Sequence, residues 1–127
     1  MRMDSDLLPL LLATAKGALK GQHIVWKDAY ALTVIMAAKG YPGSYEKGSE
    51  IRGVDGLDTD DLTVFHAGTK REGERLIANG GRVLNVTALG SSVKEAQGRA
   101  YQGVHAIDWP EGFARSDIGW RQAAREA

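Results

Sequence analysis

An almost unbroken apolar segment over residues 32–38, Leu-Thr-Val-Ile-Met-Ala-Ala, constrains the fold more than any other part of the sequence. Its short length and its β-branched residues are typical of a buried strand. The segment leads directly into Gly40-Tyr41-Pro42-Gly43. Pro42 and Gly43 suit the two central positions of a type II turn, with Gly43 at positive φ. The pattern therefore predicts a buried strand that ends in a tight turn.

Three further strand-like segments follow, over residues 63–67, 75–78 and 82–89, and Glu50-Ile51 is a candidate short strand before them. Glu72-Gly73 and Asn79-Gly80-Gly81 provide tight-turn residues between the three segments. Together they predict an antiparallel meander. In the last segment the even-numbered apolar residues share one face, which we expect to be buried, while the opposite face should be only partly buried.

A helix is predicted over residues 93–107. Ser92 and Glu95 have the spacing of a capping box, an apolar stripe follows, and Pro110 prevents the helix from continuing. Beyond it, Phe113, Ile118 and Trp120 offer apolar surface that we expect to pack back on the core. Strands followed by a helix laid across them indicate an α+β domain, small and rich in antiparallel β-structure.

The chain opens with a second predicted helix over residues 5–20. Ser5 or Asp6 can cap it, and Pro9 falls in the first turn, where its missing N–H costs little. Leucines cover most sides of its first half, so this helix should need contacts on more than one side.

Composition narrows the classes of function. With 127 residues, the chain has room for one domain and an appended element. A formal net charge of zero and the lack of a basic cluster argue against nucleic acid as the main partner. No apolar segment approaches the length of about 20 residues needed to cross a bilayer. The absence of cysteine excludes disulfides and thiolate sites and fits a cytoplasmic protein.

No local motif indicates an active site. His23, His66 and His105 lack the spacing of a metal site, and the acidic residues of the 55–61 loop lack the spacing of a calcium loop. The glycine pairs match no phosphate-binding motif and are expected in turns, and Ser91 and Ser92 are expected as helix caps.

Five ordered blocks of sequence nevertheless resemble one family, glycinamide ribonucleotide synthetase, an ATP-grasp ligase. The blocks are Ala37-Ala38-Lys39-Gly40-Tyr41-Pro42-Gly43 with Lys47-Gly48 and Ile51, Val64-Phe65-His66-Ala67-Gly68-Thr69, the stretch from Asn79 to Gly90, Ala96-Gln97-x-Arg99-Ala100-Tyr101, and Asp117-Ile118-Gly119-Trp120-Arg121. They extend over most of residues 30–121.

The resemblance implies a ligase that joins phosphoribosylamine to glycine in purine biosynthesis and splits ATP to ADP and phosphate through a glycyl phosphate. It implies that residues 1–30 are the last helix and connector of an ATP-grasp domain, and that residues 31–127 are the β-rich C-terminal domain. ATP and magnesium (or manganese) would serve the full-length enzyme, whose metal-binding Glu and Asn precede this region. The chain would work with upstream ATP-grasp and N-terminal domains. We expect it alone to be inactive, with no catalytic residue, no metal and no cofactor of its own.

The resemblance also indicates five substrate-binding candidates: Arg82, Lys39, Gly40, Tyr41 and Pro42. Arg82 follows two glycines that leave little bulk in the way of a ligand, and a guanidinium pairs with carboxylates and phosphates alike. A structural ion pair is the other role open to Arg82, and a solvated loop position is the other role open to Lys39. His66 is expected to have a packing role.

A second hypothesis from a different class is a free-standing interaction module that binds a partner through the leucine-rich helix. In either case we predict self-association through residues 5–20 when their partner is missing.

Overall fold

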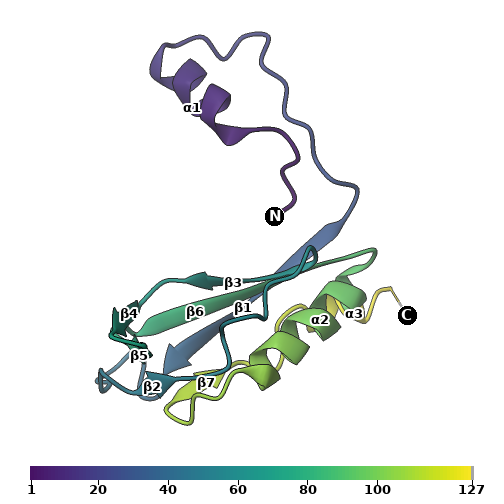
Figure 1. Ribbon diagram of the computed structural model, residues 1–127. Helices are drawn as coiled ribbons and strands as arrows, with labels where there is room; N and C mark the ends of the chain where they lie inside the picture. The colour runs from purple at the N-terminus through teal and green to yellow at the C-terminus, as the bar shows by residue number, and fades with distance from the viewer. Residues whose placement is uncertain (127) are drawn as a thin grey trace.

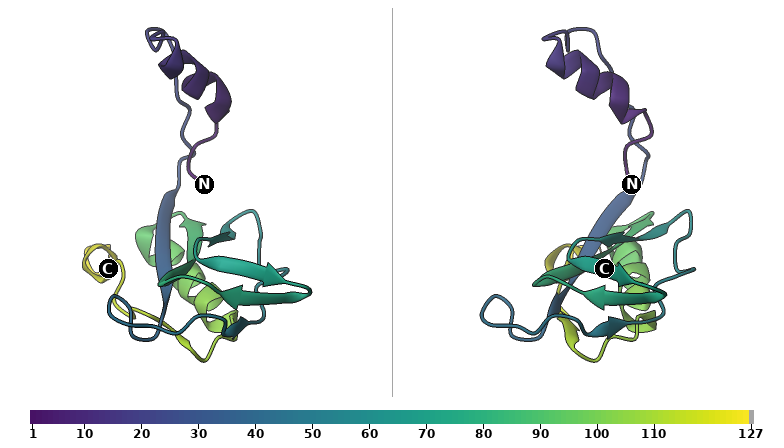
Figure 2. Two further views of the ribbon diagram at one scale, coloured as in Figure 1. Left: turned by 90° about the vertical axis from the view of Figure 1, so that its left-hand side faces the viewer. Right: turned by 60° about the vertical axis from the view of Figure 1, so that its left-hand side comes forward.

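Two parts of very different shape make up the molecule: a slender arm, residues 1–29, and a packed body that starts at residue 30. The computed structural model describes residues 1–126, so Ala127, the last residue of the predicted C-terminal domain, lies outside them. In Figure 1 the arm, which carries helix α1 (Leu7–Ala15), stands away from the body. Both turned views in Figure 2 show the same separation.

The arm is closed on itself by its own backbone. Residues 2–4 run antiparallel to residues 25–27, because the Asp4 amide donates to the Val25 carbonyl at 2.9 Å and the Lys27 amide to the Arg2 carbonyl at 2.8 Å. Asp6 caps α1 by accepting a hydrogen bond from the Leu8 amide at 3.0 Å, as predicted. The helix is shorter than expected, because Gly17 adopts a φ of 65° directly after the Lys16 cap.

A four-stranded antiparallel sheet forms the centre of the body, in the order β3-β6-β1-β7. Its strands are β1 (Tyr30–Ala38), β3 (Leu62–His66), β6 (Arg82–Gly90) and β7 (Gly112–Ala114). The two long strands, β1 and β6, lie side by side in the middle. The apolar segment over residues 32–38 is therefore a central strand, as its composition predicts.

A second sheet of three strands holds β2 (Glu50–Ile51), β5 (Arg75–Ala78) and β4 (Thr69–Glu72), in the order β2-β5-β4. The predicted meander is therefore wrong: β5 leaves the main sheet, and β3 pairs directly with β6. The Glu72-Gly73 turn joins β4 to β5. Strand β4, Thr-Lys-Arg-Glu, was not predicted because it has no apolar residue and lies at a sheet edge.

Helix α2 (Val93–Ala106) covers one face of the four-stranded sheet and confirms the predicted α+β fold. Its buried residues Ala96, Ala100 and Gly103 are small, so the helix can approach the sheet closely. A Cβ at Gly103 would lie only 2.8 Å from a methyl group of Val86. The largest fully buried side chains of the described residues are Leu84, Val34, Val83 and Val86. Val34 packs in the cluster that holds Ala96 and Ala100 of α2, and the other three pack in a cluster shared with the second sheet.

The chain after α2 forms β7 and the short helix α3 (Trp120–Ala123). Ile118 packs against the core as expected. Phe113 and Trp120 do not, since 41% and 54% of their surfaces are exposed. Neither the arm nor α2 covers the second face of the main sheet (Figure 1).

No helix within residues 1–126 is long and apolar enough to cross a membrane.

Candidate functional site

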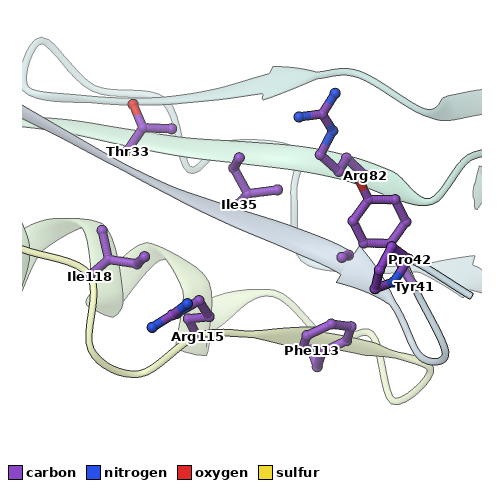
Figure 3. A pocket seen from close by; sticks show the side chains of 9 residues that line it. Thr33, Ile35, Tyr41, Pro42, Arg82, Phe113, Arg115 and Ile118 are labelled. Atoms are coloured by element: carbon purple, nitrogen blue, oxygen red, sulfur yellow. The ribbon is translucent and has the colours of Figure 1, made fainter.

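The uncovered face of the main sheet carries a groove with a volume of about 370 Å³. Strand β1 forms its floor, the loop after β1 and the start of β6 form one side, and the chain around β7 forms the other (Figure 3). The residues that line it are Thr33, Ile35, Ala37, Tyr41, Pro42, Arg82, Phe113, Arg115 and Ile118.

The floor results from the alternation of side chains along β1. Leu32, Val34 and Met36 are buried, whereas Thr33 and Ile35 are exposed on the opposite face. The odd-numbered residues Thr33, Ile35 and Ala37 therefore point into the groove.

A β-bulge turns Arg82 toward this groove. Met36 pairs with Leu84, but the next residue, Ala37, pairs with Arg82, so Val83 is an extra residue on β6. Regular alternation would place Arg82 on the helix-covered face with Leu84. The bulge instead leaves Arg82 opposite Ala37 and turns Val83 into the core, where it is fully buried.

Arg82 has no fixed partner among residues 1–126. Its side chain makes neither an ion pair nor a hydrogen bond there, although eight other ion pairs are formed. A structural ion pair, the other role considered for this residue, is thus not formed within the described chain. On the far side of Ala37, Phe113 occupies the equivalent position on β7. The groove therefore offers a free guanidinium beside an apolar floor and an aromatic side chain.

A second arginine, Arg115, stands on the opposite side of the groove, and its charge is already compensated. Its Nε and Nη2 atoms donate to the two carboxylate oxygens of Asp117 at 2.8 and 2.7 Å. These hydrogen bonds lower the pKa of Asp117 below its ordinary value. Arg115 is therefore held in place, while Arg82 remains available to an anionic ligand.

The loop after β1 differs from the predicted turn. Gly40, not Gly43, takes the positive φ, at 94°, and the Tyr41–Pro42 peptide bond is cis. A Cβ at Gly40 would overlap the Ser44 carbonyl oxygen, so the loop closes tightly on itself. Gly40 thus shapes the loop rather than lining the groove.

The structure brings three of the five predicted substrate-binding residues together. Tyr41, Pro42 and Arg82 line the groove. Lys39 lies in a separate, more polar hollow beside Glu46 and Glu111.

The sequence predicts that the glycines before Arg82 leave space for a ligand, and this prediction is wrong. Instead, the ring of Tyr41 lies where a Cβ of Gly81 would be, and the ring of Tyr45 is 3.0 Å from that position. Gly80 in turn packs on Gly68, with 2.8 Å between the Gly80 Cα and the Cβ position of Gly68. These glycines allow Tyr41 to pack beside Arg82.

Sequence reasoning missed the rest of the groove: Thr33, Ile35, Ala37, Phe113, Arg115 and Ile118. The polar Thr33 between Leu32 and Val34 is the only sequence signal on β1 for an open face. Strand β7 has only three residues, and nothing in its sequence indicates that it pairs with β1.

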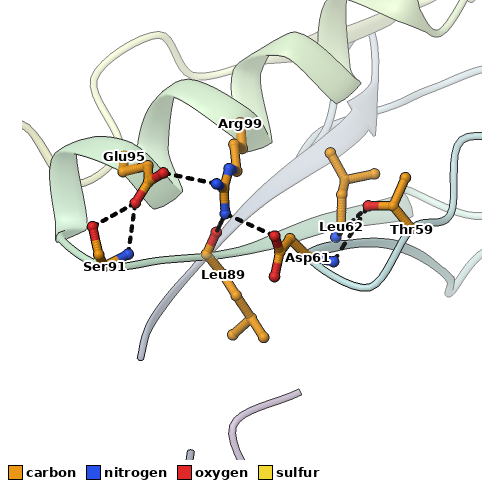
Figure 4. Close-up of polar contacts among 7 residues, drawn as sticks. All are labelled: Thr59, Asp61, Leu62, Leu89, Ser91, Glu95 and Arg99. Atoms are coloured by element: carbon orange, nitrogen blue, oxygen red, sulfur yellow. Dashed lines mark hydrogen bonds and ion pairs between the residues drawn. The ribbon is translucent and has the colours of Figure 1, made fainter. Parts of the chain in front are cut away.

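Outside the groove, charged side chains connect the start of α2 to the end of β6 (Figure 4). Arg99 donates to Glu95 at 2.7 Å, to Asp61 at 3.1 Å and to the Leu89 carbonyl at 2.8 Å. Ser91 donates to Glu95 through its hydroxyl and its amide, which lowers the pKa of Glu95. Ser92 caps α2, as predicted. This network ties α2 to the end of β6 and to the loop before β3.

His66, for which a packing role is expected, is exposed at the end of β3 and shares a hydrogen bond of 3.0 Å with the Thr69 hydroxyl. Within residues 1–126, no three His, Cys, Asp or Glu side chains gather as a metal site would require.

Comparison with known proteins identifies the family of this chain. Residues 31–121 match the family model described as phosphoribosylglycinamide synthetase, C domain. Phosphoribosylamine–glycine ligase of Mesorhizobium japonicum is 57% identical over 126 residues, which cover 99% of this chain and 30% of that protein. The chloroplastic enzyme of Arabidopsis thaliana is 50% identical over 95% of this chain and 23% of its own length.

A solved structure agrees with these matches. The crystal structure of phosphoribosylamine–glycine ligase from Thermotoga maritima superposes with a TM-score of 0.69 and 29% identity, covering 87% of this chain and 27% of that one. This chain spans about 30% of the length of bacterial relatives such as the Mesorhizobium enzyme. The family model covers most of the body, and the chain therefore belongs to the phosphoribosylglycinamide synthetase C-domain family.

Proposed function

We propose that this chain serves as the C-terminal part of a phosphoribosylamine–glycine ligase, which joins phosphoribosylamine and glycine at the expense of ATP in purine biosynthesis. Relatives with this name match it along nearly its whole length. Within that enzyme the chain supplies one wall of the substrate site and does not carry out the reaction by itself. We propose a cytoplasmic location for the protein in this role.

The observation that carries the proposal is the unpaired guanidinium of Arg82 in the groove on the sheet face. All three substrates of the ligase carry a carboxylate or a phosphate. Guanidinium binds either group through two parallel hydrogen bonds, and such bonds strengthen next to apolar side chains such as Ile35 and Phe113. Arg82 would hold the anionic group, and Tyr41 and Pro42 would bound its position.

Lys39 and Gly40 have different parts in this proposal. Gly40 keeps the 40–44 loop closed, so that Tyr41 and Pro42 reach the groove. Lys39, beside Glu46 and Glu111, would contact substrate only at the margin of the site.

ATP and magnesium are proposed for the remainder of the enzyme. The described residues gather no carboxylate cluster that fits a magnesium ion. The role left to this chain is to bind and orient a substrate at the groove.

The arm would pack against the preceding ATP-grasp domain. The relatives align with nearly all of this chain, including the arm, whereas the C-domain model begins at residue 31. These alignments support assigning the arm to a part of the ligase outside the C domain. Four leucines of α1 face solvent in this chain, namely Leu7, Leu8, Leu11 and Leu12. The preceding domain of the ligase would cover them.

An Arg82→Ala substitution in the longer ligase tests the proposal. Hydrogen bonds to charged groups contribute about 1.5–3 kcal/mol, so kcat/KM should fall about ten- to a hundredfold. Tm should change little, because Arg82 has no ion pair to lose. The matched control is Arg71→Ala on the edge strand β4, where Arg71 pairs only with the exposed Asp55. Unchanged kcat/KM together with a Tm several degrees lower would show that Arg82 is structural.

A further inference from the structure

One wall of the groove begins on β7, at Phe113, and continues past the end of that strand through a segment that belongs to no helix or strand. Arg115 and Ile118 lie between the end of β7 at Ala114 and the start of α3 at Trp120. This segment has no strand pairing to hold its backbone. Other contacts must therefore keep its side chains in fixed positions.

The hydroxyl of Tyr101, on α2, supplies that order. It donates to the Arg115 carbonyl at 2.7 Å and accepts from the Ile118 amide at 3.0 Å. These two backbone groups are three residues apart and would bond directly to each other in a closed β-turn. The phenol stands between them, so one side chain fixes both ends of the turn.

Two further contacts complete the wall. Gln97, one helical turn before Tyr101, donates to the Ile118 carbonyl at 2.6 Å. Asp117, inside the turn, holds the Arg115 guanidinium through two hydrogen bonds. The same face of α2 therefore determines where the backbone of residues 115–118 lies, and Asp117 determines where the Arg115 side chain points.

We propose that Tyr101 is a positioning residue for the substrate groove: its hydroxyl holds the 115–118 turn, and through it the wall that faces Arg82. Tyr101 itself does not line the groove, so it acts through Arg115 and Ile118. This inference rests on the proposed role of the groove in substrate binding.

The test uses Tyr101→Phe in the longer ligase, because this change removes the hydroxyl and keeps the ring. The KM of the substrate whose KM rises in Arg82→Ala should rise about three- to tenfold, as expected for a lost hydrogen bond, with kcat within about twofold. In parallel, hydrogen–deuterium exchange of the peptide covering residues 115–120 should speed up about tenfold. Tyr30→Phe is the control, because the exposed Tyr30 makes no side-chain hydrogen bond among residues 1–126.

The two readouts separate the possible failures. If Tyr101→Phe leaves KM unchanged while Arg82→Ala raises it, the positioning role is wrong and the groove remains a substrate site. If neither variant changes any KM, the proposed function fails as well. Unchanged exchange in residues 115–120 would also overturn the positioning role. Should Tyr101→Phe fail to fold, Gln97→Leu removes only the bond to the Ile118 carbonyl and should raise the same KM.

Discussion

The arm and the body are both rich in large apolar side chains, yet they place them in opposite ways. In the body, Leu84 on β6 is completely buried in a core cluster with Met36 of β1 and Leu76 of the second sheet. In the arm, Leu8 on α1 leaves 69% of its surface exposed, and Leu7, Leu11 and Leu12 are about half exposed. Both regions contain leucines, but only in the body does another part of the chain pack over them.

This difference shows what a local pattern determines and what it does not. The caps and the leucine content make α1 a helix, but a helix of nine residues is only marginally stable without packing. Within the arm only Leu10 and Ala13 of α1 are buried. The strands of the body cover one another within the same chain, whereas the outer side of α1 has no cover among residues 1–126.

The largest effect should come from a matched pair of truncations, Leu84→Ala in the body and Leu8→Ala in the arm. Leu84→Ala removes fully buried methyl groups and leaves a cavity, so the free energy of unfolding should fall by about 2–5 kcal/mol. Leu8→Ala should change it by less than about 0.5 kcal/mol, because surface substitutions rarely do more. Urea unfolding of both variants measures the difference, and similar losses would mean that α1 is packed after all.

The fold of the body could be predicted strand by strand but not sheet by sheet. The almost unbroken apolar segment of β1, the apolar alternation of β6 and the turn glycines located most strands within a residue or two. The pairing of β2 with β5 and of β3 with β6 could not be read from the chain, because these strands lie far apart in the sequence. Strand β4 has only polar residues, and nothing in them distinguishes an edge strand from a loop.

The candidate site was predictable in part, and the reasons differ among its residues. Arg82, Tyr41 and Pro42 came from resemblance to a family. That Arg82 faces the groove depends on the bulge at Val83, for which the sequence carries no signal. The opposite wall, Arg115 and Ile118, depends on the Tyr101 hydroxyl reaching them from another element.

A smaller effect is expected from the arm alone. If its leucines lack a cover, this chain should self-associate through residues 5–20. Burying Leu7, Leu8, Leu11 and Leu12 is worth roughly 1.5–3 kcal/mol each, but the entropy lost on association offsets much of it. Sedimentation over a range of concentrations should therefore show weak dimers that disappear when the four leucines become serine. A strict monomer with a protease-sensitive arm would contradict this.

The smallest effect concerns how the two helices are capped. Helix α1 in the arm relies on its neighbour Asp6, whereas α2 in the body is capped by Ser92 and also from far along the chain. The Glu126 carboxylate accepts hydrogen bonds from the Val93 amide at 3.2 Å and the Lys94 amide at 3.0 Å. The body thus closes one helix end with its own C-terminal segment, and the arm has no counterpart.

That distant cap should respond to pH in a defined direction. The hydrogen bond from the Lys94 amide is the main cause that lowers the pKa of Glu126 below its ordinary value of 4.5. A carboxylate whose pKa is lowered in the folded state stabilises the protein at pH values above the pKa of the unfolded state. This stabilisation is lost as the pH falls through the pKa of the folded state.

Glu126→Gln should therefore lower Tm slightly at pH 7, because the amide lacks the charge that favours a helix N-terminus. The gap between variant and parent should narrow as the pH falls below about 4.5 and close only below the lowered pKa of the folded state, where the parent carboxylate also becomes neutral. Thermal unfolding from pH 3 to 7 measures this, with Glu74→Gln as an exposed control. A gap that widens in acid would mean that the Glu126 carboxylate is not the second cap of α2.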